Sequence, residues 1–271
     1  MKAFFINRYG KSSGELPEPK VGGNDVLVQI HAASINPLDL KIRTGEFKQI
    51  LPYTFPLILG NDLAGVVVRA VLLSDALPTA HEIGVQYGNV QPGDTIAVIG
   101  AGPVGMGCVL TAQLYSPSSI IVIDMDDNRL AMARELGATH TINSAHEDAI
   151  ARVLEITEGR GVDCAIEAVG LEATWNICQH IVKEGGHIAN VGVHGKPVQF
   201  ALEKLWIKNL TITTGLVNAN TTSMLLKTCC SGKLPMEKLA THTFGFSELP
   251  KAYDVFKHAA DEKAMKVMID F

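Results

Sequence analysis

The sequence lacks any long hydrophobic run, and no stretch approaches the 18 apolar residues that a membrane-spanning helix needs. It also lacks a block of basic residues, and its formal net charge of −5 argues against nucleic acid or an anionic membrane as the main partner. The first ten residues have no long apolar core and no cleavage site, so they do not resemble a signal peptide. We therefore expect a cytoplasmic protein that binds neither nucleic acid nor membrane.

Cysteine is scarce, and its spacing excludes the common metal and redox motifs. The five cysteines are Cys108, Cys164, Cys178, Cys229 and Cys230, and none of them forms a CxxC pair. A disulfide between the adjacent Cys229 and Cys230 would be strained. Because most of the cysteines have apolar neighbours, we expect buried free thiols in a reducing compartment.

The strongest motif is a glycine turn between an apolar strand and a helix. Five apolar or β-branched residues, 95–99, run into Gly100-x-Gly102-x-x-Gly105. In such a turn the first glycine permits the bend, the second lets a pyrophosphate approach the backbone, and the third lets the helix pack close to the strand. The N-terminus of the helix supplies free N–H groups and a partial positive charge to the phosphates. This pattern predicts a dinucleotide site.

An acidic residue, Asp124, ends the next apolar run, 24 positions after the first glycine. A carboxylate there can accept hydrogen bonds from the adenosine ribose of NAD. Against the 2′-phosphate of NADP it would place like charges in contact, at a cost of about 1–4 kcal/mol. Asp126 and Asp127 add to that repulsion, and Arg129 is the nearby cation that offsets part of it. We predict NAD, with NADP less favoured; the alternative is a glycine-rich turn in an unrelated α/β protein.

Strands and helices alternate from residue 93 to 217, which predicts a parallel sheet covered on both faces. The ligand should lie across the carboxyl ends of its strands. The expected strands after Asp124 are 139–142, 162–168, 185–193 (with a glycine turn at its start) and 210–216, and the expected helices are 126–136 and 171–182. The extended segments 26–33 and 63–68 indicate a small β-rich unit before this region, and helices at 223–231 and 249–258 with a strand at 266–269 complete the chain.

This order of elements resembles the medium-chain dehydrogenase/reductases, which include zinc alcohol dehydrogenases and zinc-free quinone oxidoreductases. Residues 33–43 and 59–67 are similar to the quinone-oxidoreductase branch. Residues 71–271 are similar to a bacterial alcohol dehydrogenase, through the segments 75–82, 100–105, 122–124, 135–139 and 167–170. The resemblance implies an α/β fold: a Rossmann doubly wound parallel sheet, residues 82–217, plus a truncated GroES-like β-rich catalytic domain, residues 1–81 and 218–271.

Two departures from the family pattern matter. The stretch that normally lies between the strand near Val68 and the linker helix near Leu73 is absent, which suggests a deletion or a chimera of the two branches. The catalytic zinc ligands are also replaced: Asn36 stands where zinc members have Cys, and Asn61-Asp62 where they have His-Glu. Since zinc favours thiolate and imidazole, we predict no metal.

The resemblance places Asn36, Asp39 and Lys41 in the active-site loop of the quinone-oxidoreductase branch. Asn36 would donate a hydrogen bond to a substrate oxygen, Asp39 would orient the loop or relay a proton, and Lys41 would act as an electrophile or proton donor. The alternative is that residues 36–39 form only a capped turn before a short helix.

The resemblance also extends the cofactor site. The glycine turn itself comprises Gly100, Gly102, Pro103, Val104 and Gly105. The family's contacts to the nicotinamide and its ribose fall on Ala168, Val169, Gly170, Val191, Gly192 and Val193, those to the carboxamide on Leu216 and Val217, and a cation on the pyrophosphate on Lys266. For Val191 and Val193 a place in the strand core is an equally good interpretation.

Other motifs are weaker. Tyr253 and Lys257 have the YxxxK spacing of short-chain dehydrogenases but fall in a C-terminal amphipathic helix, where we expect packing and solvation. His81-Glu82 lacks the second histidine of a zincin site.

We predict hydride transfer between NAD(H) and a small alcohol, aldehyde or ketone, with a quinone as the next substrate class. The alternatives are a nucleotide-binding scaffold without catalysis and, less favoured, a methyltransferase. The resemblance implies that the strand 210–216 ends the sheet and can pair across a dimer axis, so we expect a homodimer or homotetramer.

Overall fold

The computed structural model describes residues 5–12, 30, 32–49, 53–60, 62–64 and 72–270. The chain divides into two compact units, Asp75–Leu239 and Met1–Ser74 with Ala240–Phe271. The predicted catalytic domain included residues 75–81 and 218–239, which belong here to the unit Asp75–Leu239. The predicted domain boundaries follow the family pattern and stay a prediction. No helix within the described ranges is long and apolar enough to cross a membrane.

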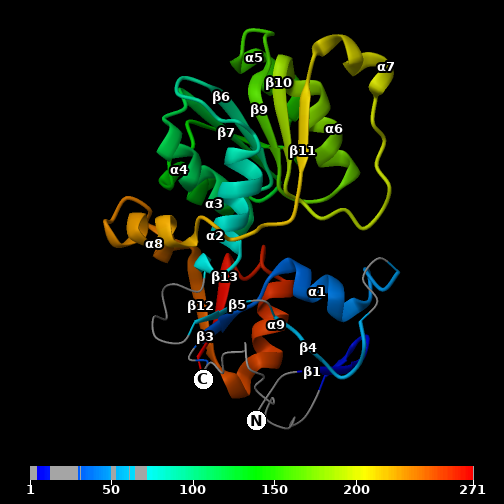
Figure 1. Ribbon diagram of the computed structural model, residues 1–271, viewed down its shortest axis with the longest axis vertical. Helices are drawn as coiled ribbons and strands as arrows, with labels where there is room; N and C mark the ends of the chain where they lie inside the picture. The colour runs from blue at the N-terminus through cyan, green and yellow to red at the C-terminus, as the bar shows by residue number, and fades with distance from the viewer. Residues whose placement is uncertain are drawn as a thin grey trace. The chain divides into compact units, whose positions relative to one another are not determined.

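A six-stranded parallel sheet forms the centre of the unit 75–239 (Figure 1). Its order is β11-β10-β9-β6-β7-β8. The strands are β6 (Thr95–Ile99), β7 (Ser119–Asp124), β8 (His140–Asn143), β9 (Val162–Glu167), β10 (Val182–Asn190) and β11 (Thr211–Thr214). The strand order reverses between β6 and β9, and ligands bind at such a reversal in doubly wound sheets. The predicted α/β fold is thereby confirmed for this unit.

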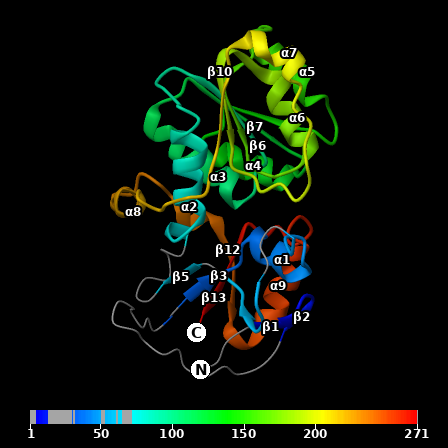
Figure 2. The ribbon, with the colours of Figure 1, turned by 45° about the vertical axis from the view of Figure 1, so that its right-hand side comes forward.

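Helices cover both faces of this sheet (Figure 2). One face is covered by α5 (Ala149–Ile156) and α6 (Glu172–Ile181), whose apolar side chains share a core with β6, β7 and β8. The other face is covered by α3 (Pro103–Ala112), α4 (Asp127–Glu135) and the π-helical η2 (Ala80–Gln86), which continues from α2 (Ala76–Thr79). The remaining elements are η3 (Gln113–Tyr115), α7 (Leu202–Leu205), η4 (Trp206–Lys208), α8 (Thr222–Cys230) and η5 (Met236–Leu239).

Several of these elements have local causes in the sequence. Asp126 caps α4 by accepting hydrogen bonds from the N–H groups of Asn128 and Arg129, and Gly137 follows the helix with φ +110°. Asp148 caps α5 in the same way. The helix α5 was not among the predicted elements, although Asp148 followed by apolar residues at helical spacing is its signal. In β10 the register shifts between Val182 and His187, so the predicted glycine turn at 185–186 is an irregularity inside the strand.

The other unit holds two small sheets in its described residues. One has the order β2-β1-β4, and the other the order β12-β13-β3-β5. The strands are β1 (Phe5–Arg8), β2 (Lys11–Ser12), β3 (Ala32–Ser34), β4 (Leu57–Ile58), β5 (Asp62–Ala64), β12 (Ala240–Gly245) and β13 (Lys266–Asp270). The helices are α1 (Pro37–Thr44), η6 (Phe246–Glu248) and α9 (Leu249–Lys257), and α9 packs its apolar face on β12 and β13. The predicted extended segments 26–33 and 63–68 lie mostly outside the described residues.

Candidate functional site

The glycine turn lies between β6 and α3, as predicted. Gly100 has φ +102°, a conformation that side chains rarely adopt. A Cβ on Gly105 would lie 1.8 Å from the carbonyl oxygen of Gly100, so only glycine lets α3 begin this close to the strand. A Cβ on Gly102 would meet nothing within 4 Å. That open space lies over the first turn of α3, which starts with Pro103 and Val104 and whose N–H groups lack intrahelical partners. The turn therefore fits a pyrophosphate.

Asp124 lies at the end of β7 and is bonded to the glycine turn. Its Oδ2 accepts a hydrogen bond of 2.6 Å from the N–H of Ala101, and its Oδ1 accepts bonds from the N–H groups of Met125 and Asp126. A carboxylate has about four acceptor positions, so Asp124 retains capacity for ribose hydroxyls. Asp124 thus holds the glycine turn through Ala101 and keeps an acceptor position for the ribose of the cofactor.

Arg129 is half-buried on α4 and faces Asp126, with 3.9 Å between Nε and Oδ2. This is a long ion pair, and Asp126 is already the N-cap of the helix. Arg129 therefore has a carboxylate beside it, which reduces its ability to attract the 2′-phosphate of NADP. The balance of charge at the end of β7 remains negative.

The loops after β9, β10 and β11 carry the other predicted cofactor residues. Ala168 donates its N–H to the carbonyl oxygen of Ile99, which joins the loop after β9 to the glycine turn at the reversal of strand order. A Cβ on Gly170 would lie 2.3 Å from the carbonyl oxygen of Val193, so the loops after β9 and β10 touch. Five predicted residues therefore meet at one edge of the sheet: Ala168, Val169, Gly170, Gly192 and Val193.

The apolar side chains predicted after β10 and β11 are at least partly accessible to solvent. Val191 and Val193 lie beyond the last residue of β10, and Val193 is 49 % exposed, so neither belongs to the strand core. Leu216 and Val217 follow β11, and Leu216 is 85 % exposed. Apolar side chains accessible at the carboxyl edge of the sheet suit contact with the flat nicotinamide end of a dinucleotide.

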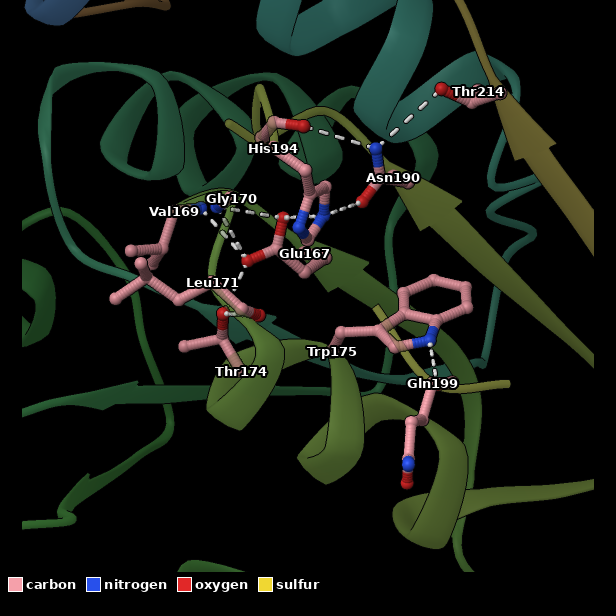
Figure 3. Close-up of polar contacts among 11 residues, drawn as sticks. Glu167, Val169, Gly170, Leu171, Thr174, Trp175, Asn190, His194, Gln199 and Thr214 are labelled. Atoms are coloured by element: carbon pink, nitrogen blue, oxygen red, sulfur yellow. Dashed lines mark hydrogen bonds and ion pairs between the residues drawn. The ribbon is translucent and has the colours of Figure 1, made fainter. Parts of the chain in front are cut away.

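Glu167 organises the loop after β9, a role the sequence prediction missed (Figure 3). Its side chain is fully buried and accepts hydrogen bonds from the N–H groups of Val169 and Gly170 and from the hydroxyl of Thr174. A buried carboxylate is tolerated only with such partners. Its signal in the sequence is an acid ending an otherwise apolar strand just before a glycine, Gly170.

His194 joins the loop after β10 to Glu167 (Figure 3). Its Nε2 lies 3.6 Å from Oε2 of Glu167 and 2.8 Å from Oδ1 of Asn190. The side-chain amide of Asn190 donates to the carbonyl oxygen of Gly192. Residues from two loops are thus held by one buried polar network at the carboxyl edge of the sheet.

The predicted catalytic residues lie in the other unit. Asn36 is the N-cap residue of α1, and its N–H donates to Oδ2 of Asp39 at 2.7 Å. Both residues are buried, so the capped turn predicted as the alternative is present. Lys41 lies on the same helix with its ammonium group 5.7 Å from the ring centroid of Phe47. A cap and a catalytic loop are compatible, so these roles stay predictions.

Lys266 lies beside Asn36 in this unit, although the sequence prediction gave the two residues separate tasks. The Lys266 side chain is fully buried on β13, and its Nζ donates to Oδ1 of Asn36. An ammonium group bonded to the amide oxygen at the place of the family's zinc-binding thiolate does not fit a divalent cation. Among the described residues no group of three His, Cys, Asp or Glu side chains could hold a metal ion. Asn61 lies outside those residues.

The other sequence features have structural roles. Cys108, Cys164 and Cys178 are buried, as expected for most of the cysteines, and burial raises the pKa of Cys108 to about 12. Cys229 is half-buried and Cys230 is exposed. Tyr253 packs in the core of its unit and Lys257 is exposed, as predicted.

Comparisons with known proteins match both parts of the chain. Residues 103–229 match the family described as zinc-binding dehydrogenase, and residues 22–108 the alcohol dehydrogenase GroES-like domain. An alcohol dehydrogenase of Cupriavidus necator is 31 % identical over 201 residues, which are 73 % of this chain and 55 % of that protein. The solved zinc dependent alcohol dehydrogenase 2 from Streptococcus pneumonia is 36 % identical, with a TM-score of 0.92 over 100 % of this chain and 98 % of that chain.

A second solved structure, alcohol dehydrogenase TADH from Thermus sp. ATN1, is 26 % identical, with a TM-score of 0.90 and full coverage of both chains. The chain spans about half the length of the curated relatives it matches. Both of its parts match alcohol dehydrogenases, so the comparisons give no support for the chimeric origin predicted from the sequence. The GroES-like and Rossmann parts of the predicted fold are confirmed.

Proposed function

Because the chain belongs to the zinc-type alcohol dehydrogenase family of medium-chain dehydrogenase/reductases, we propose that it transfers hydride between NAD(H) and a small alcohol, aldehyde or ketone. The observation that supports this most is the glycine turn closed onto Asp124, with open space over Gly102. When bound, NAD supplies the hydride acceptor.

The chain's own residues would hold the cofactor in three places. The N-terminus of α3 would bind the pyrophosphate, with Gly102 leaving room for it. Asp124 would accept hydrogen bonds from the ribose hydroxyls, which favours NAD over NADP. The loops fixed by Glu167 and His194 would position the nicotinamide.

The substrate oxygen would be polarised without zinc. Asn36 and Lys266 form a buried amide–ammonium pair, and Asp39 holds the backbone of Asn36. The family's metal is a Lewis acid for a carbonyl or alkoxide. Here the proposed substitutes are hydrogen bonds from Asn36 and Lys41, which suit a quinone or enone as the next substrate class.

A second candidate function is a nucleotide-binding scaffold without catalysis, favoured because the matched part of the chain covers only 55 % of each of two curated relatives. Turnover separates the two. NADH consumption is followed by absorbance with an aldehyde, a ketone and a quinone in turn, with the Gly102→Ala variant as the control. Cofactor consumption by the unaltered chain alone supports the oxidoreductase, and binding of NADH without consumption supports the scaffold.

A further inference from the structure

His81 is a buried polar side chain without a hydrogen-bond partner among the described residues. It lies in the π-helical η2, is 1 % exposed, and neither of its ring nitrogens is bonded. Almost all buried polar groups in native proteins are bonded, and π-helical turns are frequent at functional sites. Burial lowers the pKa of His81, although the neighbouring Glu82 raises it, so the ring is neutral and offers one donor and one acceptor.

The His81 ring lines a pocket of about 450 Å³ in the unit 75–239. The Tyr115 ring lies over the imidazole with 5.8 Å between centroids and also lines the pocket. The remaining wall is α8 and the residues after it, including Lys227 and Lys233. Both lysines are exposed, and within the part of the chain that the structure describes neither has an ion-pair partner. Two ammonium groups thus border a pocket that has a neutral imidazole as its buried wall.

The other lining groups define the ligand further. The hydroxyls of Thr228 and Ser231 donate to the carbonyl oxygens of Met224 and Thr228, so toward the pocket they can only accept. The apolar side chains of Leu114 and Met224 are 37 % and 39 % exposed. The pocket therefore combines positive charge, hydroxyl acceptors and an apolar surface.

We propose that this pocket binds the anionic group of a small organic molecule, with Lys227 and Lys233 contacting the charge, Leu114 and Met224 covering an apolar body, and the buried His81 ring in the wall sensing the bound charge. A carboxylate and a phosphate ester share this chemistry. A volume of this size is ordinary for a small-molecule site.

The pocket is separate from the proposed cofactor site. Tyr115 follows the C-terminal end of α3, whereas the glycine turn precedes its N-terminal end (Figure 1). Ten residues of helix separate the two by about 15 Å. The elements around the pocket are also tied together, because the carboxylate of Glu82 accepts hydrogen bonds from the N–H groups of Asn218 and Thr221, just before α8. Binding here is thus independent of whether the proposed function is correct.

The test is a histidine-detected NMR titration of the full chain with two probes, benzoate and inorganic phosphate. The His81 ring signal, assigned from its loss in His81→Gln, should shift saturably with at least one probe, also when NADH is present. The double variant Lys227→Gln/Lys233→Gln should weaken that binding about tenfold, since two exposed ammonium groups contribute modestly each. Lys238→Gln removes an exposed lysine outside the pocket and is the matched control.

The outcomes are distinct. A shift with benzoate alone identifies a carboxylate ligand, and a shift with phosphate alone identifies a phosphate ester. The absence of any saturable shift in the unaltered chain overturns the proposal, as does equal affinity of the double variant and Lys238→Gln. The lysine variants alter only exposed side chains, and where His81→Gln does not fold, isothermal titration calorimetry with the same two probes compares the affinities of the unaltered chain, the double variant and Lys238→Gln.

Discussion

Asp124 carries the predicted choice between the two nicotinamide cofactors. Replacing Asp124 with Ser removes a negative charge from the end of β7 and keeps a hydrogen-bonding group near the N–H of Ala101. We expect the ratio of the dissociation constants for NADP and NAD to fall by about tenfold or more, in line with the cost of like charges near a surface. The measurement is a pair of fluorescence titrations with NADPH and NADH.

The control for Asp124→Ser is Glu135→Gln, which removes an exposed charge at the last residue of α4. Its effect on the ratio should be small, because exposed charges are screened. An unchanged ratio in Asp124→Ser, or equal ratios in the two variants, would remove Asp124 from its proposed role.

Two glycines of the turn should respond differently to the same added methyl group. Gly105→Ala places a Cβ 1.8 Å from a backbone oxygen, and we expect it to lower the free energy of unfolding by at least about 3 kcal/mol. Gly102→Ala meets no atom, so its stability should be unchanged while NADH binding is lost. Urea unfolding and NADH titration measure the two effects, and tight NADH binding by Gly102→Ala would contradict the pyrophosphate assignment.

At the scale of elements, the loop after β9 depends on one buried carboxylate. Glu167→Gln keeps the shape, but its one amide oxygen can replace only Oε1, so an NH2 group at the Oε2 position faces the N–H of Gly170 and the charge beside His194 is lost. We expect a loss of about 2–3 kcal/mol in the free energy of unfolding. Glu172→Gln, at an exposed position of the next helix, is the control and should change stability little. Equal unfolding midpoints in urea for the two variants would show that Glu167 does not hold the loop.

The elements that the sequence predicted well are those with local signals. The turn between β6 and α3, the capped helix α4 and the strand β7 all have their causes within a few residues. The helix α5 has an equally local signal in its N-cap residue Asp148, although it was not predicted.

The features that the sequence could not supply are contacts between distant residues. Lys266 bonds to Asn36, 230 positions away, because β13 pairs with β3 just before α1. The family resemblance gave each residue a separate role and contained no information on their contact. The partnership of His194 with Glu167 and the pocket at His81 likewise depend on packing between elements rather than on a motif.

For the whole molecule, we propose self-association through the free edge of the large sheet. The strand β11 ends the sheet, and Ile212 on it is 38 % exposed. An open strand edge pairs readily with a second copy. Light scattering at high concentration should give a mass near twice the 29.1 kDa of one chain or a higher multiple, and Ile212→Lys, which puts a charge on this edge strand, should lower it. A mass near that of one chain would contradict the proposed homodimer or homotetramer.

We propose above all that the carboxyl edge of the six-stranded sheet is a working NAD site. The most direct measurement is a fluorescence titration of the full chain with NADH, followed in the same cuvette by an aldehyde and then a quinone. We expect saturable binding that Gly102→Ala abolishes, and consumption of the bound NADH when a substrate is added. Absence of saturable binding by the folded, unaltered chain would contradict it.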